Sequence, residues 1–98
     1  MTTTNRADEA RSIAELVVKE GLAACVQIVP KIESIYEWDG KIHADQEHLL
    51  LIKTFEDRIG AIKKMIEEKH SYEVPEFLVV PVIDGAKDYL KWMEEGTK

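Results

Sequence analysis

The sequence has 98 residues, 45% of them hydrophobic and 33% charged, with a formal net charge of −6 and a single cysteine. This length supports one modest core, so we expect residues 1–98 to form a single domain. The negative charge argues against general nucleic-acid binding, no apolar run approaches the roughly 20 residues of a membrane-spanning helix, and the polar start has no signal-peptide core, which together predict a cytoplasmic protein.

The N-terminal part predicts a helix between two strands. Apolar residues spaced by three and four within residues 6–20 predict a helix with one buried face, and Asn5 is a suitable N-cap. Only residues 1–4 precede this helix, so a first strand would be very short. The apolar run of residues 22–29 ends at Pro30 and favours a buried strand.

Residues 32–48 predict a long β-hairpin. Asp39 and Gly40 lie between two extended segments, which is the strongest short-range signal for a two-residue hairpin turn. The returning strand continues into residues 49–52, which are apolar on both faces. Such a strand belongs in the middle of a sheet or at an interface between chains.

The C-terminal part predicts a helix, a strand and a last helix. Thr54 is a suitable N-cap for a second helix with a regularly spaced apolar face. Pro75 ends the following connection, and residues 77–83 predict another strand, although Pro81 would place its far end at an edge. Residues 86–93 predict a short terminal helix. With the short first strand, the order is that of an α+β ferredoxin-like βαββαβ fold with an extra C-terminal helix.

Six segments, in the same order and spacing, resemble the CutA family of divalent-cation tolerance proteins. They are residues 3–5, 21–26, 34–42, 52–54, 70–76 and 88–92, which read TTN, GLAACV, SIYEWDGKI, IKT, HSYEVPE and DYLKW. The resemblance runs from one end of the chain to the other. It implies a ferredoxin-like protomer, a homotrimer built through the hairpin strands, and tolerance to copper and other divalent cations.

The length of the hairpin agrees with the implied trimer. A domain of this size cannot cover such a hairpin by itself, and its free edges would pair with another chain. A closed symmetric assembly satisfies these edges without leaving a template for aggregation. We therefore expect Tyr36 and Trp38, which flank the turn, to lie at an interface, although an aromatic platform for a ligand is an alternative.

The resemblance implies copper ligands on the first strand and at the end of the second helix. The corresponding positions are Thr2, Lys69 and His70, so His70 is the one ligand that this chain retains and the candidate for binding a divalent cation such as Cu(II). His70, Tyr72 and Glu73 would then line a cleft that binds a metal or a small ligand. Alternatively, His70 caps the C-terminal end of the helix.

Other polar side chains have two interpretations each. Lys53 ends an apolar strand, so it either holds an anionic ligand or pairs with a carboxylate of a neighbouring chain. His43, Asp45 and Glu47 alternate and would share one face of a strand, as ligands of a divalent ion or as a solvated surface. Cys25 lies in an apolar run, which favours a buried thiol over a metal ligand.

No enzyme motif is present. The sequence has no recognisable Ser/His/Asp arrangement, no glycine-rich phosphate loop and no HExxH motif. We therefore expect a trimeric binding protein that is not an enzyme. The alternative is a signalling module resembling the PII proteins, which would bind a small anionic effector between protomers with Lys53 in the cleft.

Overall fold

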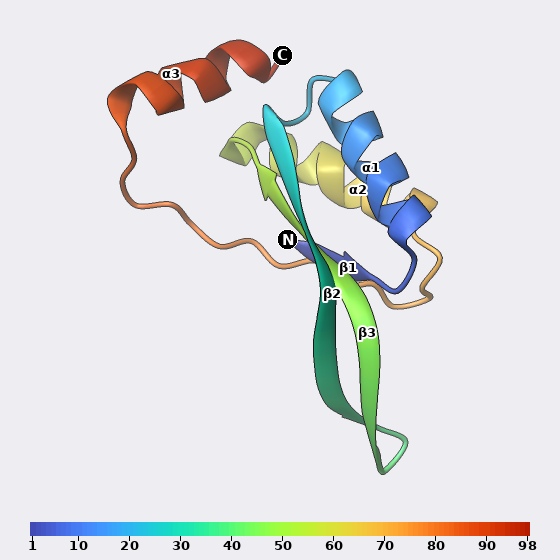
Figure 1. The fold of residues 1–98 in the computed structure, drawn as a ribbon. Helices are drawn as coiled ribbons and strands as arrows, with labels where there is room; N and C mark the ends of the chain where they lie inside the picture. The colour runs from blue at the N-terminus through green and yellow to red at the C-terminus, as the bar shows by residue number, and fades with distance from the viewer.

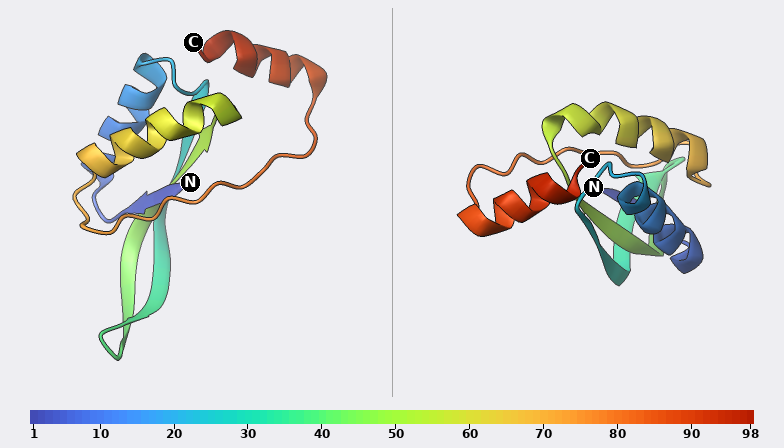
Figure 2. Two further views of the ribbon diagram at one scale, coloured as in Figure 1. Left: turned by 180° about the vertical axis from the view of Figure 1, so that it is seen from behind. Right: turned by 90° about the horizontal axis from the view of Figure 1, so that it is seen from above.

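The computed structural model describes residues 1–98 as an α+β chain with a three-stranded antiparallel sheet. In chain order its elements are β1 (Thr2–Thr4), α1 (Ala7–Lys19), β2 (Cys25–Trp38), β3 (Lys41–Lys53), a short 3-10 helix η1 (Glu56–Arg58), α2 (Ile59–Lys69) and α3 (Lys87–Gly96). The hairpin of β2 and β3 projects beyond the body, and α3 lies away from α1 and α2 (Figures 1 and 2). None of the helices combines the length and apolar character needed to cross a bilayer.

The core lies where α1 and α2 pack against the sheet. Its buried members are Ala10, Ile13, Ala14, Val17, Ala23, Leu50, Ile62 and Ile66. The periodic apolar faces predicted for the two helices are thus confirmed. The predicted caps are wrong, because Arg6 and not Asn5 occupies the N-cap of α1, and the Thr54 hydroxyl donates a hydrogen bond to the Leu22 carbonyl instead of capping a helix.

The sheet has the order β1-β3-β2, so β3 is central, as its apolar residues predict. The hairpin turns at Asp39 and Gly40, whose φ angles of 56° and 75° are those that a two-residue turn needs. Pro30 does not end the strand, contrary to the sequence-based prediction. β2 runs through it with an irregularity between Val29 and Ile32, which an edge strand tolerates because its outer N–H groups need no partner in the sheet.

The strand predicted at residues 77–83 is not formed in the single chain. Phe77 packs against the core, and Leu78 exchanges two hydrogen bonds with Met1, one from its backbone N–H at 3.1 Å and one to its carbonyl at 2.6 Å. Beyond Leu78 the segment leaves the body (Figure 1). Beyond the pair with Met1 the segment has no neighbouring strand in the single chain, so strand propensity alone does not produce a strand here.

Candidate functional site

A cluster of polar side chains lies where β1, α1 and the end of α2 meet. The Glu9 carboxylate of α1 accepts hydrogen bonds from the Thr4 hydroxyl at 2.5 Å and from both the backbone N–H and the hydroxyl of Ser71 at 2.9 Å. Burial alone would raise the pKa of the Glu9 carboxyl, but these hydrogen bonds outweigh burial and lower it. Glu9 is therefore an ionised anchor that joins three segments of the chain.

The His70 ring is fully buried beside Glu9 and uses both of its nitrogen atoms. Nε2 lies 2.6 Å from the Thr3 carbonyl oxygen and must donate, while Nδ1 accepts the backbone N–H of Tyr72 at 3.0 Å. The Nδ1 atom is also 3.7 Å from a carboxylate oxygen of Glu9. In this conformation the ring is a neutral Nε2–H tautomer, and it has no free lone pair for a metal ion.

Tyr72 extends the cluster to β3. Its hydroxyl donates to Glu47 at 2.7 Å, and its ring centroid is 4.6 Å from that of His70. Burial and the bond to Glu47 raise the pKa of the Tyr72 phenol. Glu73, the neighbouring candidate, is exposed and makes no hydrogen bond or ion pair with another side chain. The structure therefore joins His70 and Tyr72 but leaves Glu73 outside their network.

Lys53 lies elsewhere, at the far end of β3. It is six residues from Glu47, or about 20 Å along a strand. Its ammonium donates to the Tyr89 hydroxyl at 3.1 Å and lies 5.2 Å from the centroid of that ring. No carboxylate of the same chain pairs with it. Cys25 is the residue opposite Lys53 in the sheet and is a half-buried free thiol.

The hairpin carries the predicted interface aromatics near its turn. Trp38 is 62% exposed, and the Tyr36 ring stacks on His43 with centroids 5.5 Å apart while its hydroxyl donates to Asp45. This bond to Asp45 raises the pKa of the Tyr36 phenol. Within one chain, no three histidine, cysteine or carboxylate side chains meet in a group that could hold a metal ion. His43 and Asp45 therefore have no third ligand from the same chain.

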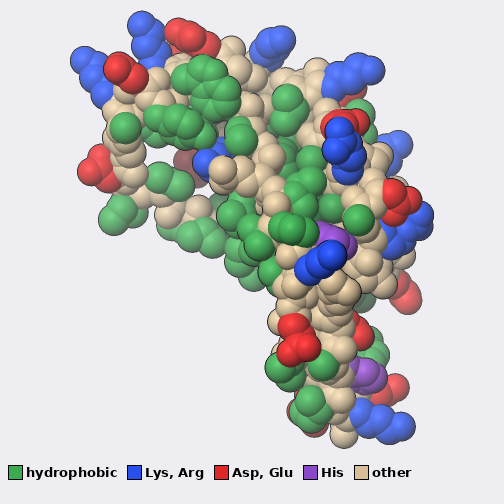
Figure 3. Space-filling view, viewed as in Figure 1, with side chains coloured by type: hydrophobic (Ala, Val, Ile, Leu, Met, Phe, Trp, Pro, Cys, Tyr) green, Lys and Arg blue, Asp and Glu red, His purple; other side chains and the backbone are tan.

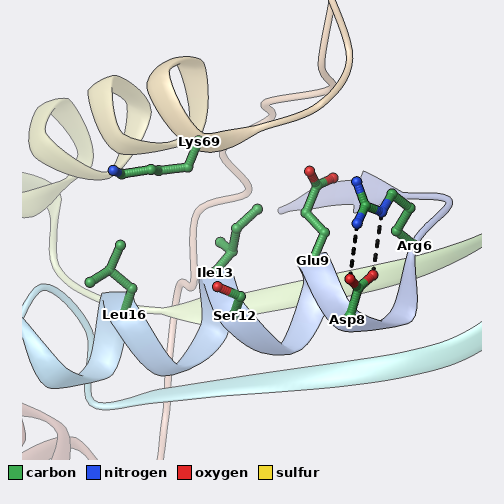
Figure 4. A pocket seen from close by; sticks show the side chains of 7 residues that line it. All are labelled: Arg6, Asp8, Glu9, Ser12, Ile13, Leu16 and Lys69. Carbon is green, nitrogen blue, oxygen red and sulfur yellow. Dashed lines mark hydrogen bonds and ion pairs between the residues drawn. The ribbon is translucent and has the colours of Figure 1, made fainter.

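An open groove of about 250 Å³ runs between α1 and the end of α2 (Figure 4). Arg6 and Asp8 form an ion pair at one end of it, with nitrogen and oxygen 2.9 Å apart, and Lys69 points into it from α2. Its lining combines both signs of charge with few apolar groups. It therefore offers neither a cation nor an anion a consistent environment.

Sequence reasoning did not find Glu9 or Glu47 as partners of the candidate residues. Glu9 suits the N-terminal turn of a helix, which is all that its local sequence indicates. Its Ser71 partner is 62 positions away, and the Glu47 partner of Tyr72 is 25 positions away. No local pattern carries that information.

Comparison with known proteins gives a consistent result. The family model described as CutA1 divalent ion tolerance protein matches residues 1–96. The chain is 42% identical to the divalent-cation tolerance protein CutA of Thermus thermophilus, covering 99% of this chain and 94% of that protein. It is 41% identical to the chloroplastic protein CutA of Arabidopsis thaliana over all of this chain, which spans only 53% of that longer protein.

Solved structures agree with the sequence comparisons. The structure of the Thermus thermophilus protein superposes with a TM-score of 0.94 and covers 99% of this chain and 94% of the other. CutA1 from Oryza sativa, 39% identical, superposes with a TM-score of 0.95 over 99% of this chain and 89% of its own. A relative from Archaeoglobus fulgidus, 33% identical with a TM-score of 0.94 over 99% of this chain and 94% of its own, is described as periplasmic. The relatives therefore differ in the compartment that their names give.

Proposed function

Because this chain belongs to the CutA1 divalent ion tolerance family, we propose that it serves divalent-cation tolerance as a homotrimer that binds a cation or a small ligand and catalyses no reaction. We place it in the cytoplasm, on the sequence features given above. The observation that carries the proposal is the amount of surface, much of it apolar, that a single chain leaves exposed.

The exposed area is larger than a monomer of this mass should have. The single chain exposes 7104 Å². A folded monomer of this size typically exposes about 5,700 Å², so roughly 1,400 Å² is in excess. In a ring each protomer has two neighbours and buries about 800 Å² against each of them, which is close to this excess.

Many of the exposed side chains are large and hydrophobic, and most of these lie on three segments. Exposed large hydrophobic residues occur on the hairpin, on the segment between α2 and α3, and on α3 itself, and include Ile35, Trp38, Ile42, Val80, Val82, Ile83, Leu90 and Trp92. Figure 3 shows hydrophobic side chains gathered over α3 and the adjoining segment. An apolar surface of this extent is typical of an interface with another chain.

Unpaired backbone supports the same conclusion. The outer edge of β2 has no partner strand, and residues 79–83 are extended without one. Backbone N–H and C=O groups in an interface need partners, so the two segments suit one another between copies. Because they are different surfaces, such contacts can run head to tail from copy to copy and close into a ring. The number of protomers in the ring, three, comes from the resemblance to the CutA family.

We place the cation site between protomers and not within one. A divalent cation bound by nitrogen or oxygen ligands needs several of them, and no three suitable side chains meet in the single chain. The half-buried His43 and the exposed Asp45 lie on the hairpin, where a neighbouring copy adds further ligands. We leave His70 out of the ligand set, because a metal ion there would have to displace the Thr3 carbonyl or the Tyr72 amide.

Native mass spectrometry with and without copper(II) tests the proposal. We expect a trimer that takes up a whole number of copper ions. A monomer at micromolar concentration would refute the assembly. A trimer with only scattered copper adducts would refute the cation site and favour a small anionic ligand, which nucleotides and dicarboxylates would reveal by raising the melting temperature.

A further inference from the structure

The strand β2 lies at the edge of the sheet, and its regular pairing with β3 is interrupted near its middle (Figure 1). Between Val29 and Ile32, β2 advances by three residues while β3 advances by two. Pro30 and Lys31 therefore stand together opposite one residue of β3, which is a β-bulge. The φ angle of Lys31 is 56°, in the left-handed region that residues other than glycine rarely adopt. The fold keeps the bulge at a conformational cost, which points to a role for it.

The bulge removes hydrogen-bond donors from the free edge of β2. Pro30 has no backbone N–H. The Lys31 N–H is directed to β3, where it donates to Nδ1 of His48 at 3.4 Å. Two consecutive residues therefore offer no donor to the outer side, and they divide the free edge into residues 25–29 and residues 32–38. A strand added to this edge can bond on one side of the bulge but cannot continue its ladder across it.

The bonding side of the segment between α2 and α3 follows from its contact with Met1. Leu78 exchanges both its N–H and its C=O with Met1. Because successive residues of an extended chain direct these groups to opposite sides, Val80 and Val82 face the same side as Leu78. Pro81 faces the other side, where its missing N–H leaves no acceptor without a partner. The side towards Met1 is therefore the one that can bond a partner strand.

The two halves of the β2 edge differ in the strand that they suit. Residues 25–29 read CVQIV and carry no charge, whereas residues 32–38 include two glutamates. Residues 79–83 read VVPVI, an uncharged segment of the same length as the first half. Ile28 and Val29 in the first half are 37% and 39% exposed, so apolar cross-strand pairs would cover them.

We propose that the bulge at Pro30 and Lys31 is a stop for strand pairing between copies, which confines residues 79–83 of a neighbouring copy to residues 25–29 of β2. This inference deepens the proposed function and rests on its assembly. A partner strand that cannot cross the bulge cannot slide along the whole edge, so the stop fixes its register. One register gives one angle between neighbouring copies, which a closed ring requires.

Removing the bulge tests the stop. Pro30→Val combined with deletion of Lys31 matches β2 to β3 residue for residue and leaves an unbroken edge. Sedimentation velocity should then show species heavier than the trimer. Lys31→Gly is the matched control, because glycine adopts the same φ angle freely, so the trimer should stay and the melting temperature should rise by about 4 °C. A deletion variant with the sedimentation profile of the wild type would overturn the stop.

Hydrogen exchange on the unmodified full chain, resolved by residue, tests the stop without any variant. Among the β2 amides that are not bonded to β3, those of residues 25–29 should exchange at least about tenfold more slowly than those of residues 32–38. Protection on both sides of the bulge would overturn the stop. Protection on neither side would overturn the strand pairing itself.

Two proline variants test the bonding side of the partner strand. Val80→Pro removes an N–H on the side of Met1, so it should weaken trimer association at least about fivefold, the loss of one hydrogen bond at each interface. Val79→Pro removes an N–H on the opposite side and should leave association unchanged. Equal effects would overturn the assigned side. A monomeric wild type would instead overturn the proposed trimer, and the stop would still be decided by whether the deletion variant associates.

Discussion

Thr2 has a polar atom that forms no hydrogen bond in the fold. The residue is 1% exposed, and its hydroxyl oxygen is buried without a hydrogen-bond partner. A buried hydroxyl with no partner costs about 1–3 kcal/mol, and valine replaces it with a methyl group of similar size. Thr2→Val should therefore raise the free energy of unfolding by about 1 kcal/mol, or the melting temperature by about 4–8 °C for a chain of this length.

Thr4 on the same strand provides the control. It is also fully buried, but its hydroxyl donates to Glu9 and accepts the backbone N–H of Arg6 at 3.3 Å. Thr4→Val should lower the free energy of unfolding by about 1.5–3 kcal/mol, because the lost bond was made to a charged group. Urea unfolding at one fixed protein concentration, followed by circular dichroism, compares the two variants. A Thr2→Val variant as unstable as Thr4→Val would refute the reasoning, since it would mean that the Thr2 hydroxyl has a partner.

Three further changes test the polar cluster and the assembly. Glu9→Gln should lower the free energy of unfolding by about 1.5–3 kcal/mol at pH 7. Because folding lowers the pKa of Glu9, its stabilising contribution is complete above the ordinary carboxyl pKa and is lost as the pH falls through the folded value. The free energies of unfolding at pH 7 and pH 3 should therefore differ less in the variant than in the wild type. His70→Asn keeps an acceptor for the Tyr72 amide but loses the donor to the Thr3 carbonyl, so the free energy of unfolding should fall by about 1 kcal/mol. Copper uptake measured by native mass spectrometry should stay unchanged. Loss of copper from the variant would show that the His70 ring is a ligand. Trp38→Ala should lower the trimer fraction in sedimentation velocity more than it lowers the stability of the fold, and an unchanged fraction would remove Trp38 from the interface.

Local signals in the sequence predicted the elements whose geometry depends on near neighbours. The spacing of Ile13 and Val17 predicted the buried face of α1, and both are almost completely buried. Asp39 and Gly40 predicted the hairpin turn, because few residue pairs adopt positive φ angles readily. The resemblance of six segments to the CutA family predicted the family that the comparisons show.

The predictions that proved wrong concern features that depend on contacts with residues distant in the sequence. Residues 77–83 have the composition of a strand, but within the single chain only Leu78 exchanges backbone hydrogen bonds with another segment, at Met1. Pro30 is a reasonable strand end by propensity, yet an edge position and a bulge accommodate it. The helix caps predicted at Asn5 and Thr54 do not form. The Thr54 hydroxyl instead donates a hydrogen bond to a carbonyl 32 positions away.

The sequence by itself therefore determined the periodic faces, the turn and the family, because each depends on residues that are close in the chain or on a pattern shared with relatives. Tertiary structure alone decided the chemistry of His70. Its ring could have been an exposed ligand, but it is a buried hydrogen-bonding group, because the fold brings Thr3, which is 67 positions away, and the Glu9 carboxylate beside it. The environment of a polar group is set by what the fold brings to it, and that information is not contained in the residues on either side.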